Sequence, residues 1–394
     1  MSRKITVGID IGTYQIKVVV AEELREQGRS VPKIIGCGFE ESRGLRHGYI
    51  LNQNDAARSL RKAIAQAEKA SGVRIKRAYA SIGGVGLHGT MVSGSVMVSR
   101  ADKEITELDV DKSIMASKGE IPQSFIVNRE IIHTIPIHYK VDGKSALGRP
   151  NGMKGLRLEA KTHFITCLEH HLRDLVEVIG EAGVETEDIV AAPIAASIVT
   201  LTKAQKVAGC VLANIGSETV SIVVYEDNLP VSLEVFPFGS NDITKDIALG
   251  LRIPLEEAES VKRGSVVGAS YSRKKLEEII SARLSDIFEL IEAHLKKIGR
   301  NGLLPAGIVL TGGGSGIPEI EELAKFSLRL PSRIGLIHPN LASRTEIKDA
   351  SWAVAYGLCI IGLGEEGDDE SPTGIRLAKK TKNDFVLWFR QFLP

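Results

Sequence analysis

Two stretches far apart in the chain share one pattern, in which two apolar segments are joined by a short polar turn. VGIDIGTYQIKVVV spans residues 7–20, and VLANIGSETVSIVV spans residues 211–224. The Val and Ile residues suit buried β-strands, and the glycine in each turn lets the backbone come close to a ligand. The pattern therefore predicts two matching β-hairpins whose turns can hold an anion.

The two hairpins align without gaps, and a third glycine-rich turn follows them. The alignment pairs Asp10 with Asn214, Ile11 with Ile215, Gly12 with Gly216 and Thr13 with Ser217. AGIVLTGGGSGIPEIEEL, at residues 306–323, predicts a strand, a run of glycines and a helix that starts near Ile317 or Pro318. Backbone N–H groups in such a turn, with a helix N-terminus behind them, attract phosphate.

Taken singly, each turn is also explained as a plain connection between strands. In this order, however, the two hairpins and the glycine run resemble the two phosphate motifs and the adenosine motif of the actin-like ATPase superfamily. That superfamily includes actin, the heat-shock chaperone ATPases and sugar kinases. The resemblance implies an α/β fold, the actin-like ATPase fold, with two duplicated ribonuclease-H-like domains.

The composition limits the classes of protein and partner. A chain of 394 residues is expected to form more than one domain, and 43% hydrophobic with 25% charged residues is typical of a soluble globular protein. A net charge of +1 without a basic, aromatic-rich patch predicts no nucleic acid partner. Four well-separated cysteines indicate reduced thiols rather than disulfides or a zinc site. No signal peptide is expected, and the longest apolar runs fall short of the roughly 18 residues of a spanning helix.

Changes in residue composition and in the spacing of apolar residues along the chain predict its domain organisation. We interpret residues 81–161 as a small α+β insertion, after which residues 156–166 are expected to resume the first domain as a strand. Helices expected at 191–200 and 349–363 are rich in small residues. They are either ordinary buried helices or, as the resemblance implies, the hinge between domains. The expected parts are residues 1–80 and 162–204 (first actin-like domain), 81–161 (insertion), 205–245 and 303–363 (second domain core), 246–302 (shortened helical subdomain), 364–378 (flexible linker) and 379–394 (amphipathic helix).

The last residues are the second informative stretch. In KKTKNDFVLWFRQFLP, helical spacing puts large apolar residues on one face, near basic residues and after an acidic linker. This pattern predicts an amphipathic helix that binds lipid weakly, so stable attachment needs several tails on one assembly. The alternative is that the helix packs on the protein's own core. The residues expected to contact the membrane are Phe385, Val386, Trp388, Phe389, Phe392 and Leu393.

Longer stretches narrow the resemblance. VGIDIGTYQIK, SRGLRHGYILN, REIIHTIPIHYKVDG and AGIVLTGGGSGIPEIEELA, with the insertion and the detached tail, resemble the FtsA family of actin-like bacterial division proteins over almost the full length. The resemblance implies a peripheral protein on the cytoplasmic face of the cell membrane at the division site, acting with other division proteins. Such a protein binds ATP and Mg²⁺, assembles into actin-like filaments and tethers FtsZ filaments by holding the C-terminal peptide of FtsZ.

The resemblance also implies a nucleotide site. The first hairpin would face the phosphates or the magnesium ion, with Asp10 as the metal ligand, and the second hairpin would lie opposite. The glycine run would approach the adenosine, and a Glu and a Lys of the helical subdomain would contact the nucleoside; an exposed helical charge pair is the alternative for these two. No catalytic residue is assigned. The implied nucleotide-binding residues are Asp10, Gly12, Thr13, Tyr14, Lys17, Asn214, Gly216, Ser217, Thr219, Glu259, Lys262, Gly312, Gly313, Gly314 and Ile317.

Two departures from the family's pattern bear on activity and partners. Asn214 stands where the superfamily usually has Asp. An amide cannot act as a base or bind Mg²⁺ with charge, so we predict nucleotide binding with slow or negligible hydrolysis. The segment between Arg263 and Lys274 is shorter than in typical members, in the subdomain that the family uses to contact FtsZ. The basic residues 273–275 still suit an acidic peptide.

Two other functions are compatible with the same fold. A PilM-type scaffold of type IV pilus assembly shares the fold and a similar insertion, but it has no use for a lipid-binding tail. A small-molecule kinase needs a catalytic carboxylate in a substrate cleft, and the sequence offers no candidate outside the phosphate turns.

Overall fold

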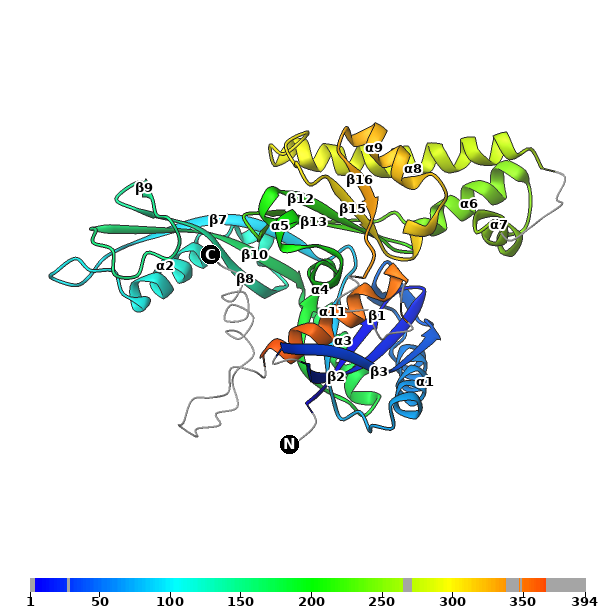
Figure 1. The fold of residues 1–394 in the computed structure, drawn as a ribbon, viewed down its shortest axis with the longest axis horizontal. Coiled ribbons are helices and arrows are strands. Elements are labelled where there is room, and N and C mark those ends of the chain that lie inside the picture. Colours follow the sequence, from blue (N-terminus) through cyan, green and yellow to red (C-terminus); the bar gives the residue numbers. More distant parts are fainter. Residues whose placement is uncertain (1–3, 27–28, 265–270, 338–346, 348, 366–394) are drawn as a thin grey trace.

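The first half of the molecule is built on a five-stranded sheet (Figure 1). The computed structural model describes residues 4–26, 29–264, 271–337, 347 and 349–365. The strand order is β11-β6-β1-β2-β3, and β1 pairs antiparallel with β2 and parallel with β6. The hairpin expected at residues 7–20 is therefore confirmed. The strands are β1 (Ile5–Ile11), β2 (Gln15–Glu26), β3 (Arg29–Glu41), β6 (Arg77–Ile82) and β11 (Glu185–Ala191), and a short ladder joins β4 (Leu45–Arg46) to β5 (Tyr49–Ile50).

The second half repeats this topology. Its sheet has the order β14-β13-β12-β15-β16, with β12 antiparallel to β13 and parallel to β15. The β12–β13 hairpin thus takes the place of β1–β2, which confirms the duplicated α/β architecture. The strands are β12 (Cys210–Ile215), β13 (Val220–Glu226), β14 (Leu229–Phe236), β15 (Ile308–Thr311) and β16 (Ser332–Ile334).

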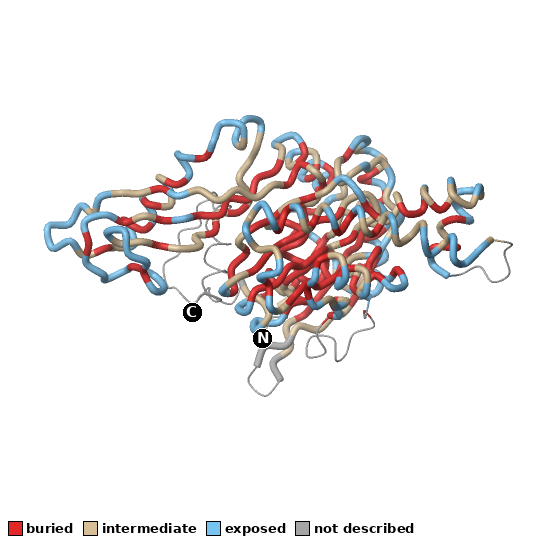
Figure 2. Tube along the Cα trace, turned by 90° about the horizontal axis from the view of Figure 1, so that it is seen from above, coloured by how far each residue is buried: buried red, intermediate tan, exposed pale blue. Residues whose placement is uncertain are grey.

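Helices and sheets alternate in layers. Because side chains along a strand point to opposite faces, Leu212 and Val223 join one core with the first sheet, α4 and α11, whereas Val211 and Val224 join a second core with α6, α8 and α9. Figure 2 shows the buried residues concentrated in this central body. The helices are α1 (Gln53–Ser71), α3 (Glu169–Glu181), α4 (Ala192–Thr200), α5 (Lys203–Ala208), α6 (Ser240–Leu251), α7 (Leu255–Lys262), α8 (Arg273–Lys297), α9 (Ile320–Leu328) and α11 (Ala353–Glu365), with 3-10 turns η1 (Gln123–Phe125), η2 (Gly313–Gly316) and η3 (Ala350–Trp352).

The helix pair α4 and α11 lies between the two sheets at very short distance. A Cβ at Gly357 of α11 would lie 1.9 Å from the carbonyl oxygen of Ala195 in α4. On its other side α11 meets β1, where a Cβ at Gly8 would lie 2.1 Å from the carbonyl oxygen of Ala355. The close approach expected from small residues is therefore present. The helix expected from residue 349 begins instead with η3, and α11 starts at Ala353.

A third, four-stranded sheet projects from the body as an elongated lobe (Figures 1 and 2). The expectation that residues 156–166 return to the first domain is wrong, because β10 pairs along its length with β7 and β8. The boundary at residue 161 consequently falls inside a strand of the insertion. The elements are β7 (His88–Met97), α2 (Glu107–Gly119), β8 (Arg129–Val141), β9 (Lys144–Ser145) and β10 (Arg157–Leu168), in the sheet order β7-β10-β8-β9.

The C-terminal linker and amphipathic helix expected at residues 364–394 lie almost entirely outside the described residues, which end at Glu365. Within the described part of the chain, no helix has both the length and the apolar composition needed to cross a membrane. The cysteines found there are all free thiols, three of them buried.

Candidate functional site

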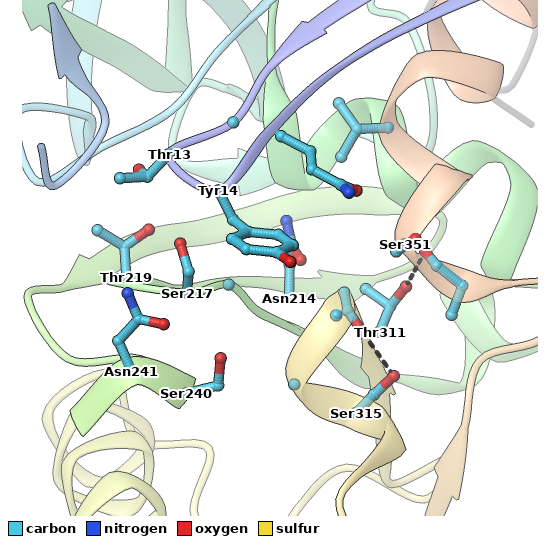
Figure 3. A pocket seen from close by; sticks show the side chains of 18 of the residues that line it. Thr13, Tyr14, Asn214, Ser217, Thr219, Ser240, Asn241, Thr311, Ser315 and Ser351 are labelled. Carbon is cyan, nitrogen blue, oxygen red and sulfur yellow. Dashed lines mark hydrogen bonds between the residues drawn. The ribbon is translucent and has the colours of Figure 1, made fainter. Parts of the chain in front are cut away.

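A cavity of about 1000 Å³ separates the two halves, and all the nucleotide-site residues expected from the sequence line it. Its floor is the helix pair, through Ala192 and Ala196 of α4 and Ala353 and Val354 of α11. Figure 3 shows the Tyr14 ring pointing into the space, with Thr13 above Ser217 and Thr219. This volume is at the upper end of the usual range for small-molecule sites. The expected residues in its wall are Asp10, Gly12, Thr13, Tyr14, Lys17, Asn214, Gly216, Ser217, Thr219, Glu259, Lys262, Gly312, Gly313, Gly314 and Ile317.

The two phosphate turns have the same backbone geometry. A Cβ at Gly12 would lie 2.9 Å from the carbonyl oxygen of Gln15, and a Cβ at Gly216 would lie 2.9 Å from that of Thr219. Real Cβ atoms essentially never come this close to backbone. The two hairpins therefore require a glycine at the matching position for the same reason: the turn is tight and leaves no room for a side chain.

Asp10 and Lys17 face each other across the first hairpin. Burial raises the pKa of Asp10, opposed by Lys17 and by a 2.8 Å hydrogen bond from the Ser81 hydroxyl. Burial lowers the pKa of Lys17, opposed by nearby carboxylates, Asp10 first. The Lys17 Nζ donates to the carbonyl oxygen of Ser351 at 2.8 Å and lies 5.5 Å from the Trp352 ring centroid. Lys17 thus connects the first hairpin to η3, which directly precedes α11.

The glycine run lies against the second hairpin. Gly312 has φ +85°, and a Cβ there would lie 2.3 Å from the Asn214 Oδ1. The helix expected to start near Ile317 or Pro318 is present as α9 and begins slightly later, at Ile320; before it, Gly313–Gly316 form the 3-10 turn η2. Four residues with little side-chain volume favour this tighter turn over an α-helix.

In the charged pair of α7, Lys262 is buried and Glu259 is half-buried, so the alternative of a solvent-exposed charge pair is wrong for Lys262. The Lys262 side chain is 6% exposed and its Nζ lies 2.6 Å from the Glu259 carboxylate and 2.7 Å from the Thr244 hydroxyl. Burial alone would raise the pKa of Glu259, but hydrogen bonds from Lys262 and Thr244 outweigh it and the pKa is lowered. Burial lowers the pKa of Lys262 despite this pair. The arrangement fixes one wall of the cavity.

Sequence reasoning missed several polar residues of the wall. The N-terminus of α6 abuts the second phosphate turn, since the Ser240 N–H donates to Gly216 O at 2.9 Å and the Asn241 N–H to Ser217 O at 2.7 Å. The sequence does indicate a helix soon after the repeated hairpin. The spacing along the chain, however, does not show that this helix contacts the turn. The missed residues are Ser81, Ser240, Asn241, Thr244, Arg263, Thr311 and Ser351.

Among the described residues, no group of three or more His, Cys, Asp or Glu side chains is placed to hold a metal ion. The expected membrane-contacting residues lie outside the described part of the chain. They are Phe385, Val386, Trp388, Phe389, Phe392 and Leu393.

The chain matches two family models. Residues 211–357 match the model for cell division protein FtsA, and residues 86–166 match the SHS2 domain inserted in FtsA. It is 34% identical over 383 residues to the cell division protein FtsA of Borreliella burgdorferi, covering 91% of each chain. It is 31% identical over 379 residues to that of Bacillus subtilis, covering 91% of this chain and 83% of the relative.

Solved structures with the same fold have much lower identity. The PilM–PilN type IV pilus biogenesis complex matches with a TM-score of 0.67 and 17% identity, covering 91% of this chain and 98% of the other. MreB5 of Spiroplasma citri bound to AMPPNP matches with a TM-score of 0.54 and 14% identity, covering 93% and 98%. At such identities these likenesses concern the fold alone.

Proposed function

Because the chain belongs to the FtsA family of actin-like cell division proteins, we propose that it binds ATP with Mg²⁺ between its two halves, assembles into filaments and tethers FtsZ to the cytoplasmic face of the cell membrane. The observation that carries nucleotide binding is the convergence of both phosphate turns and the glycine run on one cavity. The MreB5 structure with bound AMPPNP has the same fold. PilM is like this chain in fold only, whereas the relatives from Borreliella burgdorferi and Bacillus subtilis are cell division proteins.

The cavity suits a nucleoside triphosphate chemically. The two tight turns face each other from opposite halves. Backbone N–H groups in glycine-rich turns favour negative charge. We assign the phosphates to the space between the turns of Gly12 and Gly216, and the adenosine to the side of Gly312–Gly314 and the Glu259–Lys262 pair.

The donor set fits a magnesium ion that arrives with the nucleotide. Mg²⁺ is usually bound by one or two carboxylates together with substrate phosphates and waters, and Asp10 supplies one carboxylate. Bound Mg²⁺ would neutralise charge on the phosphates. Asn214, opposite, contributes an amide that neither binds the cation with charge nor accepts a proton, so hydrolysis is expected to be slow or negligible. Turnover near one per second would contradict this assignment.

The site is tested by filling the cavity without disturbing the protein. A Cβ at Gly313 meets no atom within 4 Å and the residue has no left-handed φ, so Gly313→Leu places its side chain in the cavity. We expect at least tenfold weaker binding of a fluorescent ATP analogue. Gly180→Leu is the matched control, because Gly180 in α3 is equally free of neighbours and exposed. Equal affinity in the two variants would remove the cavity as the nucleotide site.

The membrane tether is proposed from the amphipathic pattern of the last residues. Sedimentation with anionic lipid vesicles, of the full chain and of a chain ending at Thr381, with and without ATP, tests it. We expect only the full chain to sediment, and more of it with ATP, because filaments multiply a weak lipid affinity. Lipid binding by the truncated chain would refute the tether.

The partner peptide is assigned to the helical subdomain of α6, α7 and α8. Its basic edge is less basic than the sequence suggests, because Arg273 pairs with Glu277 at 2.9 Å and Lys274 approaches Glu278 at 4.0 Å. We therefore propose that the C-terminal peptide of FtsZ binds with a modest electrostatic contribution. Fluorescence anisotropy of the labelled peptide should show micromolar binding that weakens little with added salt; absence of binding would contradict the assignment.

A further inference from the structure

The two phosphate turns carry, at equivalent positions, side chains that span the cleft. In the hairpin alignment Tyr14 corresponds to Glu218, each two residues after the turn's glycine. Tyr14 belongs to the first half and contacts Arg263 of the second half. Glu218 belongs to the second half and contacts His47 of the first. The contacts are thus reciprocal across the duplicated fold.

The Tyr14 contact lies in the wall of the cavity, which Tyr14 and Arg263 both line. An Arg263 Nη2 donates to the Tyr14 hydroxyl at 3.3 Å, and the guanidinium lies 5.7 Å from the ring centroid, within range of a cation–π interaction. Arg263 is held in place by Glu259, whose Oε1 lies 2.7 Å from its Nε. Because Tyr14 is 48% exposed, this contact is the weaker of the two.

The Glu218 contact is shorter than the Tyr14 contact, and its partner is a backbone N–H rather than a long arginine side chain. The Glu218 Oε2 accepts the His47 backbone N–H at 2.6 Å, and the His47 Nδ1 lies 3.2 Å from the Glu218 carbonyl oxygen. His47 has φ +49°, a conformation uncommon for a residue other than glycine. Strained backbone of this kind persists when surrounding contacts hold it, and it concentrates at functional sites.

The loop of residues 42–50 joins both turns. It is bonded to the first turn by Ser42 N–H to Tyr14 O at 2.9 Å and by Gly48 N–H to the Thr13 hydroxyl at 3.1 Å. It reaches the second turn through His47. Opening the cleft therefore separates His47 from Glu218 as well as Tyr14 from Arg263.

We propose that the Tyr14–Arg263 and Glu218–His47 contacts are two locks across the cleft that set the rates of nucleotide entry and release. This inference rests on the nucleotide binding proposed above. Tyr14 and Glu218 act as positioning residues, because they hold the halves together rather than carry out chemistry. Both contacts join one half to the other, so moving the halves apart breaks them.

The test is stopped-flow kinetics of a fluorescent ATP analogue with the full chain. A hydrogen bond to a charged group is worth more than an exposed cation–π contact, so we expect Glu218→Ala to raise the dissociation rate about tenfold and Tyr14→Ala about threefold. The double variant should show the product, about thirtyfold. Association rates should rise together with dissociation rates, so Kd should change less than either rate. A variant that merely damages the site would instead bind with a higher Kd and no faster association.

Two further variants sharpen the test. His47→Ala keeps the backbone N–H that Glu218 accepts, so it should accelerate release less than Glu218→Ala does. Glu289→Ala, on the exposed side of α8, is the control for removing a glutamate. Unchanged rates in both Glu218→Ala and Tyr14→Ala, with the wild-type chain binding the analogue, would overturn the locks alone. Failure of the wild-type chain to bind would instead overturn the proposed nucleotide site.

Discussion

His163 makes the stability of this protein depend on pH in a way that can be calculated. It lies in β10 of the insertion, it is 1% exposed, and its Nδ1 lies 2.7 Å from the carbonyl oxygen of Pro230 in β14. The neutral ring donates Nδ1–H to that oxygen. Its Nε2 is buried without a hydrogen-bond partner in the described structure and faces Gly89, where a Cβ would lie 2.4 Å away. A second proton on His163 would therefore sit on Nε2, where burial excludes bulk water and the described residues offer no hydrogen-bond acceptor to stabilise the charge.

Burial lowers the pKa of His163 from 6.5 to about 4. Between these values the folded protein binds fewer protons than the unfolded chain, so stability is complete above pH 6.5 and is lost as the pH falls toward 4. Linkage gives a loss of about 2 kcal/mol between pH 7 and pH 5, and about 3 kcal/mol by pH 4. Because His163 and Pro230 join the insertion to the second sheet, the loss weakens that junction first.

The assay is urea unfolding followed by far-ultraviolet circular dichroism at pH 7, 6 and 5. In His163→Asn the amide N–H can still reach Pro230, and we expect the fall in unfolding free energy from pH 7 to pH 5 to be about 2 kcal/mol smaller than in the wild type. His138→Asn, on β8 of the same sheet, is the control and should keep the wild-type slope. Equal slopes for wild type and His163→Asn would refute the reasoning.

Three further changes have defined outcomes. Gly357→Ala pushes a Cβ to 1.9 Å from Ala195 O, so we expect about 2–3 kcal/mol of destabilisation, measured by thermal unfolding; an unchanged midpoint would show that the helix pair separates freely. Asn214→Asp introduces a carboxylate beside the hairpin turns and should raise ATP turnover at least tenfold in a phosphate-release assay; an unchanged rate would contradict the role given to Asn214. Glu259→Gln leaves the buried Lys262 without a counter-charge and should lower stability by about 1–3 kcal/mol, an effect that 0.5 M salt should barely change if the pair is truly shielded.

Local patterns predicted the two hairpins and the helix of small residues at 191–200. Two apolar segments joined by a glycine turn have few alternatives to a hairpin. Local residues also set both ends of α1: Asn52 is its N-cap, and Gly72 ends it with φ +68°. The residues proposed to bind the nucleotide came from the resemblance to the family, and they line one cavity because the duplicated hairpins face each other.

What the sequence could not give is which distant surfaces meet. β10 has the alternation of any half-buried strand, and nothing in it tells whether β8 or the first sheet is its neighbour. Likewise the position of Lys17, bonded to Ser351 more than 300 residues later, depends on the packing of α11 against β1. The pairing of Glu218 with His47 is equally non-local.

The cavity floor formed by α4 and α11 has a mechanical consequence. Atoms that already touch cannot move closer, so a rotation of one half relative to the other would pivot at this contact. Displacement grows with distance from a pivot, so such a rotation would move wall residues far from Gly357 more than those near it. A ligand that contacts both halves far from the helix pair would therefore have the most leverage on the angle between them.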